Sequence, residues 1–161
     1  MKMLVMSDSH SGLSFMRAAI KSVKPDVLVH LGDHYDDAET IACENLHIPM
    51  YHVPGNCDLY RCFGKPEMMC LTICGVMTFM AHGHTYGVKG STARLLAAAR
   101  EHDAKLVLYG HTHEPDCRQE DDVWIVNPGS CGSYSGSVAL IEIEDGQVCR
   151  CRILTAGAFT W

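Results

Sequence analysis

The stretch Met3-Leu4-Val5-Met6-Ser7-Asp8-Ser9-His10 sets the pattern for the first half of this 161-residue chain. Four apolar residues in a row predict a short strand that is buried on both faces. Two polar side chains, Asp8 and His10, follow the strand directly. The next apolar residues repeat at helical spacing, at Leu13, Met16, Ile20 and Val23, and Lys24-Pro25 should end that helix. A buried strand, a polar loop and an amphipathic helix together begin an α/β fold.

The same order repeats further along the chain. Buried strands are expected at residues 27–31 and 50–53. Between them we expect a helix that is capped by Asp36 and Asp37. The inner face of this helix would carry Ile41, Ala42 and Leu46. Strands that alternate with helices predict a parallel sheet.

Turn signals dominate the second half and predict hairpins. Cys74-Gly75 separates apolar runs at 68–73 and 76–81, Asp121-Asp122 separates 117–120 from 123–126, and Asp145-Gly146 separates 137–143 from 147–154. A helix over 91–101 and a buried strand over 105–109 lie between the first two hairpins. We expect these later strands to form a second sheet, mixed or antiparallel. The predicted fold is α/β: a four-layer α-β-β-α sandwich of two mixed sheets flanked by helices, in a single domain over residues 1–161.

The composition narrows the class of protein. Apolar residues make up 47% of the chain, which is ordinary for a globular domain, and no apolar stretch is long enough to cross a bilayer. A net charge of −6 argues against a stable nucleic-acid partner. The nine cysteines form no recognisable disulfide framework, and the N-terminus does not resemble a signal peptide. We therefore expect a reduced, cytoplasmic protein without a membrane partner, whose cysteines mostly pack in the core.

Seven side chains that are able to bind metal follow the apolar runs. They are Asp8, His10, Asp33, Asn56, His82, His111 and His113. Ligands of an open α/β sheet bind beyond the carboxyl ends of its strands, so these loops can converge on one site. Imidazole combined with carboxylate and amide oxygens suits transition metals better than an all-oxygen site does. The set predicts two metal ions above a sheet and a hydrolase that acts on phosphate esters.

The chain resembles the calcineurin-like metallophosphoesterases in five motifs. These are Asp8-x-His10, Gly32-Asp33, Gly55-Asn56-x-Asp58, His82-Gly83 and Gly110-His111-x-His113. The resemblance extends from Met1 to about Tyr134. The short length, the cysteine in Gly-Asn-Cys-Asp and the run His82-Gly83-His84-x-Tyr86 are similar to the small YfcE-type phosphodiesterases of bacteria and archaea. The loop Asn127-Pro128-Gly129-Ser130 also resembles a loop of that subgroup.

The resemblance implies a role for each ligand. Asp8, His10 and His113 would hold one ion, Asn56, His82 and His111 would hold the other, and Asp33 would bridge the two. It also implies a metal-dependent phosphodiesterase in which a metal-bridging hydroxide attacks a small or activated phosphodiester in line, nucleotide-like diesters included. The cofactors would be two divalent transition-metal ions, manganese first, with nickel, zinc or iron as alternatives.

Cys57 departs from the wider family. Many members carry a histidine at this position, which is proposed to protonate the leaving oxygen, and a neutral thiol is a poor donor for that step. His84, Asp58 near a water, or a metal-bound water could act instead, or the substrates could be limited to good leaving groups. Asn56, Asp58 and His84 are therefore the candidate catalytic residues. His84 could instead orient a ligand, and Asp58 could orient Asn56 or cap a neighbouring segment.

Other functions and partners stay open on the sequence alone. A phosphomonoesterase would use the same ligands, whereas a non-catalytic scaffold such as the retromer subunit would share the fold without needing all seven. A DNA nuclease of the superfamily would need a capping domain and a basic surface. Phe63, Tyr86 and Tyr134 are candidates for stacking on a base. An apolar edge near Ile153 and Leu154, together with the tail 158–161, favours a homo-oligomer.

Overall fold

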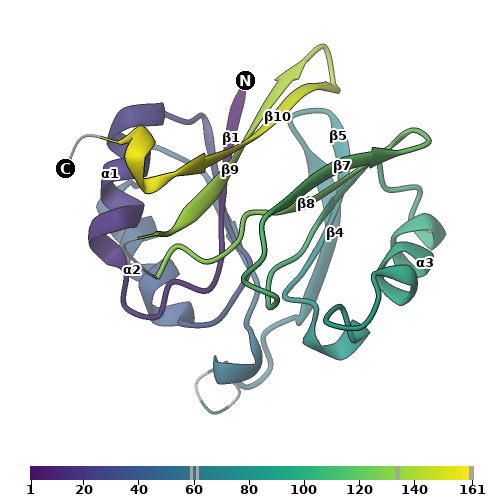
Figure 1. Cartoon of the computed structure of the whole chain (residues 1–161), viewed down its shortest axis with the longest axis horizontal. Coiled ribbons are helices and arrows are strands. Elements are labelled where there is room, and N and C mark those ends of the chain that lie inside the picture. The colour runs from purple at the N-terminus through teal and green to yellow at the C-terminus, as the bar shows by residue number, and fades with distance from the viewer. Residues whose placement is uncertain (59, 61, 133–134, 160–161) are drawn as a thin grey trace.

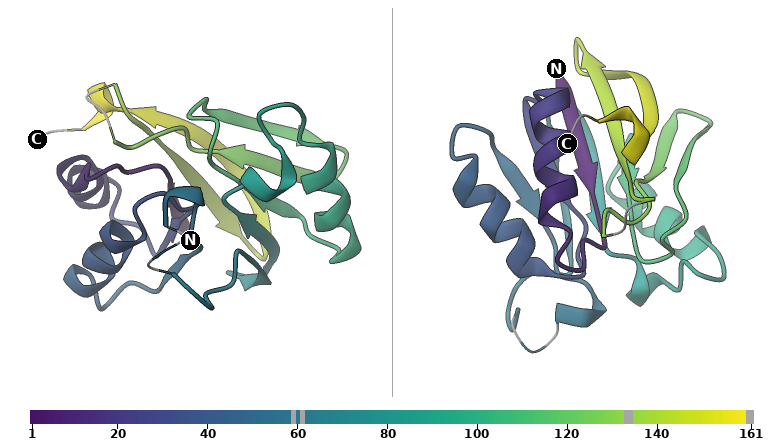
Figure 2. Two further views of the ribbon diagram at one scale, coloured as in Figure 1. Left: turned by 90° about the horizontal axis from the view of Figure 1, so that it is seen from below. Right: turned by 60° about the vertical axis from the view of Figure 1, so that its left-hand side comes forward.

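The computed structural model describes residues 1–58, 60, 62–132 and 135–159 of the chain, and it contains two five-stranded sheets packed face to face (Figure 1). The first sheet has the order β10-β9-β1-β2-β3 and the second the order β4-β5-β6-β8-β7. Helices α1 and α2 cover the outer face of the first sheet, and α3 covers the outer face of the second (Figures 1 and 2). The predicted α-β-β-α sandwich of two mixed sheets is confirmed.

The first sheet begins with the βαβ units that the N-terminal half predicts. Its elements are β1 (Lys2–Met6), α1 (Leu13–Val23), β2 (Val27–His30), α2 (Tyr35–Glu44), β3 (Met50–His52), β9 (Ser137–Glu144) and β10 (Gln147–Thr155). Strands β1, β2 and β3 pair in parallel, and β9 pairs antiparallel with β1. Along β1, Leu4 and Met6 pack against α1, while Met3 and Val5 face the second sheet. Both faces of β1 are therefore buried, which explains its uninterrupted apolar run.

The second sheet has parallel strands at its centre and an antiparallel strand at each edge. Its elements are β4 (Met68–Ile73), β5 (Val76–Ala81), α3 (Ala93–Glu101), β6 (Leu106–Leu108), β7 (Asp116–Glu120) and β8 (Val123–Asn127). Strands β5, β6 and β8 are parallel to one another, and β4 and β7 run antiparallel at the two edges. Leu95, Leu96 and Ala99 of α3 pack on Phe79 and Val107. Three short 3-10 helices complete the fold, namely η1 (Asn56–Asp58), η2 (His84–Tyr86) and η3 (Ala156–Ala158).

The last hairpin corrects the sequence interpretation. Strands β9 and β10 were expected in the second sheet, yet β9 pairs with β1 in the first. The reason lies in the burial of β9: Ala139 and Ile141 face the core between the sheets, while Val138 and Leu140 face α1. A strand that is apolar on both faces is stable only between two packed layers.

Helix α2 also differs from its prediction. The helix ends at Glu44, and Leu46 beyond it is 87% exposed, so Leu46 is not on an inner face. The N-cap residue is His34, and neither Asp36 nor Asp37 caps the helix. Asp37 lies in the first turn and accepts hydrogen bonds from the Ser9 hydroxyl and the Ser11 amide at 2.7 and 2.8 Å. This carboxylate therefore ties α2 to the loop that follows β1.

The cysteines and the C-terminal tail give two further corrections. Cys117 on β7 and Cys151 on β10 form a disulfide between edge strands of the two sheets, with Cα atoms 6.5 Å apart, although no disulfide was expected. Their separation of 34 residues hides this proximity in the sequence. In the tail, the Phe159 side chain is buried against Phe15, so it adds nothing to an exposed apolar edge, while the homo-oligomer itself stays a prediction. Residues 160–161 lie outside the described part of the chain. Among the described helices, none is long and apolar enough to cross a membrane.

Candidate metal centre

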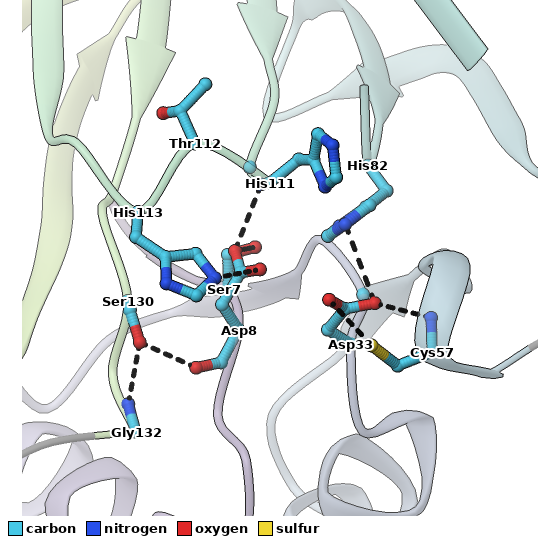
Figure 3. Close-up of polar contacts among 12 residues, drawn as sticks. Ser7, Asp8, Asp33, Cys57, His82, His111, Thr112, His113, Ser130 and Gly132 are labelled. Carbon is cyan, nitrogen blue, oxygen red and sulfur yellow. Dashed lines mark hydrogen bonds and ion pairs between the residues drawn. The ribbon is translucent and has the colours of Figure 1, made fainter. Parts of the chain in front are cut away.

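The ligand loops meet at one end of the sandwich, between the two sheets. The loops after β1 and β2 bring Asp8 and Asp33 from the first sheet, and those after β5 and β6 bring His82, His111 and His113 from the second (Figure 3). Parallel pairing within each sheet is what places these strand ends at a common edge. The seven side chains named from the sequence therefore gather around one site.

One cluster consists of Asp8, His10 and His113, whose ligand atoms all lie within 4.8 Å of one another. His113 Nε2 is 3.1 Å from Asp8 Oδ1, and the rings of His10 and His113 have centroids 5.4 Å apart. Asp8 is fully buried, whereas His10 and His113 are exposed. The cluster thus combines a buried carboxylate with two exposed imidazoles.

A second cluster shares Asp8 and adds Asp33 and His82, again within 4.8 Å. His82 Nε2 is 3.5 Å from Asp33 Oδ1 and 3.1 Å from Asn56 Oδ1. His82 Nδ1 lies 2.7 Å from the carbonyl oxygen of Leu31. Because a carbonyl oxygen only accepts hydrogen bonds, Nδ1 is the donor in this contact. Nε2 faces the oxygens of Asp33 and Asn56 and is the ring nitrogen that remains available to a metal.

His111 completes this cluster. Its ring centroid lies 5.0 Å from that of His82, and its backbone N–H donates to Asp8 Oδ2 at 3.1 Å. Burial lowers the pKa of His111, and the neighbouring His82 and Lys89 lower it further. A depressed pKa keeps the imidazole neutral, which is the form that binds a metal.

The carboxylates Asp8 and Asp33 are buried beside imidazoles. They are 0% and 3% exposed, and within the part of the chain that the structure describes no lysine or arginine pairs with either. Burial works to raise the pKa of Asp33, yet the Cys57 amide and the His82 ring outweigh it and hold this pKa below its usual value. Buried, ionised carboxylates need a compensating cation, and this donor set of imidazole, carboxylate and amide fits a divalent metal.

The backbone of these loops is strained where the ligands sit. Five of the seven candidate ligands have positive φ angles, namely Asp8 (53°), His10 (41°), Asp33 (56°), His111 (69°) and His113 (61°). Residues other than glycine rarely adopt this region, and it persists only where the surroundings impose it. The strain is thus concentrated at the site and fixes the direction of the ligand side chains.

Two glycines permit the close approach of these loops. A Cβ on Gly110 would lie 2.9 Å from Asp8 Oδ2 and closer still to the hydroxyl of Ser7. A Cβ on Gly55 would overlap the carboxylate of Asp33. The glycines that precede Asn56 and His111 in the motifs are therefore required by space around the carboxylates.

Several residues support the ligands; Ser7 was not identified from the sequence, and Asn127 and Ser130 were identified only as parts of a loop. The Ser7 hydroxyl donates to Asp8 Oδ2 at 2.5 Å, and the Ser130 hydroxyl donates to the backbone oxygen of Asp8 at 2.8 Å (Figure 3). Asn127 Nδ2 donates to Gly110 O at 3.1 Å and to Thr112 Oγ1 at 3.0 Å, which holds the loop of His111. The segment Asn127 to Ser130 thus positions ligand loops, a task that its turn-forming composition alone does not reveal.

Asp58 is buried and accepts three hydrogen bonds from backbone amides. Its Oδ1 accepts the amides of His34 and Tyr35 at 2.9 Å each, and its Oδ2 accepts the amide of Gly55 at 2.8 Å. It therefore caps α2, which precedes it in the chain, and closes the turn that leads into Asn56. This arrangement supports a positioning role rather than a proton-donating one.

Cys57 lies against Asp33. Its backbone N–H donates to Asp33 Oδ1 at 2.9 Å, and its Sγ is 3.3 Å from Oδ2 (Figure 3). Burial together with the adjacent carboxylate raises the pKa of the Cys57 thiol to about 11. The thiol therefore stays protonated and donates to Asp33.

His84 lies beside the second cluster. Its ring centroid is 5.4 Å from that of His82 and 6.1 Å from that of His111. Its Nδ1 is buried and has no hydrogen-bond partner among the described residues. Burial lowers the pKa of His84, and the neighbouring His82 lowers it further. His84 is thus a neutral imidazole at the border of the site.

Comparison with known proteins agrees with this geometry. The model of the calcineurin-like phosphoesterase superfamily domain matches residues 1–146. A phosphodiesterase from Methanocaldococcus jannaschii is 30% identical over 160 residues, which cover 90% of this chain and 93% of the relative. A probable metallophosphoesterase from Bacillus subtilis is 30% identical over 81% of this chain and 75% of its own length.

Solved structures show the same fold. A predicted phosphoesterase from Streptococcus pneumoniae superposes with a TM-score of 0.77 at 26% identity, covering 99% of this chain and 92% of that one. Vps29 from Entamoeba histolytica, complexed with Zn²⁺, superposes with a TM-score of 0.72 at 22% identity, covering 97% and 99% of the two chains, and shares the fold alone. The chain belongs to the calcineurin-like phosphoesterase superfamily and is a phosphoesterase, a hydrolase of a family that uses divalent metals.

Proposed function

We propose that this protein is a metal-dependent phosphodiesterase with a dinuclear metal centre. The observation that carries the proposal is the pair of buried carboxylates, Asp8 and Asp33, which are surrounded by imidazoles and lack any lysine or arginine partner among the described residues. Such a pair is stable only next to a cation.

The two clusters suggest which residues hold each ion. Asp8, His10 and His113 would hold one, and Asn56, His82 and His111 the other. Asp33, within 4.8 Å of both Asp8 and His82, would lie between them. We propose manganese as the first candidate, with nickel, zinc or iron as alternatives.

Divalent ions in such a pair supply an activated water and neutralise the charge of the phosphoryl group. The protein's own contribution is positional. Ser7, Ser130 and the His111 amide fix Asp8, while the Cys57 amide and thiol fix Asp33. Groups held in this way need no reorganisation when the substrate binds.

His84 is our candidate for contact with the leaving oxygen of the ester. It borders His82 and His111, and its buried Nδ1 has no partner within the described chain. Cys57 is a weaker candidate because its thiol proton is held at a pKa of about 11 and is directed to Asp33. Asn56 would contact the substrate as well as the metal.

The preference for diesters rests on the relative that is named a phosphodiesterase. To test it, metal-stripped protein is resupplied with Mn²⁺, Ni²⁺, Zn²⁺ or Mg²⁺ and assayed on bis-p-nitrophenyl phosphate and p-nitrophenyl phosphate. We expect metal-dependent hydrolysis of the diester, lost in Asp8→Asn and His82→Ala and retained in His47→Ala, a change at an exposed histidine. Faster hydrolysis of the monoester would show a phosphomonoesterase instead. Metal-independent turnover would refute the proposal.

A further inference from the structure

A cavity of about 230 Å³ opens next to the proposed metal centre. It lies between the segment that follows β3, which projects at the bottom of Figure 1, and the 3-10 helix η2. The residues that line it include Pro54, Gly55, Phe63, Lys65, Glu67 and His84. Its lining therefore combines apolar groups with two opposite charges and an imidazole.

The cavity borders the site already described. Gly55 lines it and directly precedes Asn56, a candidate ligand. His84 also lines it, and the His84 ring lies 5.4 Å from that of His82. A group attached to a phosphate at the metal centre can therefore extend past His84 into this space.

One aromatic side chain of the lining is exposed. Phe63 is 99% exposed, and Tyr60, which is also exposed, is not among the lining residues. Tyr86, the other described stacking candidate, packs instead on Phe79 with ring centroids 5.9 Å apart, and Tyr134 lies outside the described residues. An exposed phenyl ring beside a polar cleft is typical of a surface on which a ligand ring stacks.

We propose that this cavity binds an aromatic ester group of the substrate, the size of one nucleobase, stacked on Phe63. The inference rests on the proposed phosphodiesterase function and names the class of diester. The cavity is smaller than the roughly 300–1,000 Å³ typical of sites for drug-sized ligands, so it accommodates one ring system rather than a whole dinucleotide. Lys65 and Glu67 supply a donor and an acceptor for polar atoms at the edge of the ring.

The test uses two phosphonates that differ only in the presence of a ring. Dissociation constants of phenylphosphonate and methylphosphonate are measured by calorimetry on Mn²⁺-loaded protein, for the wild type, Phe63→Ala and Leu46→Ala. Leu46 is a matched control because it is an exposed apolar side chain at the end of α2. Phe63 is itself exposed, so its removal leaves the core intact.

In the wild type we expect phenylphosphonate to bind about tenfold more tightly, the size of effect that stacking on one aromatic side chain gives. Phe63→Ala should bring the two constants to within about twofold and leave methylphosphonate unchanged, and Leu46→Ala should keep the preference. Equal binding in the wild type, or a preference that survives Phe63→Ala, would overturn the inference while methylphosphonate binding still supports the metal centre. Failure of both phosphonates to bind would overturn the inference and the proposed function together.

Discussion

Replacement of Gly110 by alanine should disrupt the metal centre without changing any ligand. The new Cβ would lie 2.9 Å from Asp8 Oδ2 and 3.1 Å from Ser7 Cβ, and it would overlap the Ser7 hydroxyl. Ordinary contact requires at least 3.4 Å, so the Asp8 carboxylate must retreat. The displacement is about half an ångström or more, which is the tolerance within which a functional site must be held.

The size of the effect follows from the role of the Ser7 hydroxyl. Its 2.5 Å hydrogen bond orients the carboxylate that both clusters share. Loss of such an orienting partner typically weakens metal affinity or activity by about 10- to 100-fold. We expect a loss of that order in Mn²⁺ affinity, measured by calorimetry, and a parallel loss in kcat/KM on the diester.

Two further variants make this prediction specific. Gly90→Ala is the control, because a Cβ there would meet nothing closer than 3.7 Å. Ser7→Ala removes the orienting hydroxyl without adding bulk at Gly110, so it should lose Mn²⁺ affinity to a similar degree. If Gly110→Ala binds Mn²⁺ as tightly as Gly90→Ala does, the steric argument is wrong.

Three other changes test separate parts of the account. Asp58→Ala leaves three amides without an acceptor and should lower the free energy of unfolding by about 3 kcal/mol or more. The pH profile of the residual kcat/KM should keep its shape, whereas the loss of its acidic or basic limb would show a proton-transfer role. Cys57→His should raise turnover on diesters with poor leaving groups, and unchanged turnover would refute the idea that the thiol limits them. Burial lowers the pKa of His30 from 6.5 to about 3, so protons bind the unfolded chain first and stability falls as the pH falls below 6.5. Chemical denaturation between pH 8 and pH 5 should show a loss of about 2 kcal/mol from this group, absent in His30→Asn; equal slopes in the two proteins would contradict the assignment.

The local elements of the fold were predictable because they depend on local sequence. The apolar run at Met3 to Met6 and the turn at Cys74-Gly75 each specify a strand or hairpin without reference to distant residues. The pairing of strands and of cysteines that lie far apart in the sequence was less predictable. The sheet to which β9 belongs depends on the burial of both its faces, and the pairing of Cys117 with Cys151 depends on two sheet edges meeting. Both are properties of packed layers rather than of a sequence window.

The candidate site shows the same division. Ligand positions could be predicted because each follows an apolar strand and belongs to a recognisable motif. The residues that hold the ligands in place could not be predicted in the same way. The hydroxyls of Ser7 and Ser130 act by contacting Asp8, and Ser130 is 122 residues away from Asp8 in the sequence. Asp58 had an ambiguous role in the sequence, and the three amides that its carboxylate accepts favour positioning, which the Asp58→Ala variant tests.

The number of metal ions per chain tests the central claim most directly. Metal-stripped protein is titrated with Mn²⁺ by calorimetry, and bound metal is then measured by elemental analysis. We predict two ions per chain in the wild type and in His47→Ala, and one in His113→Ala, which removes a ligand from one cluster only. A wild-type protein that binds a single ion, or none, would contradict the dinuclear centre.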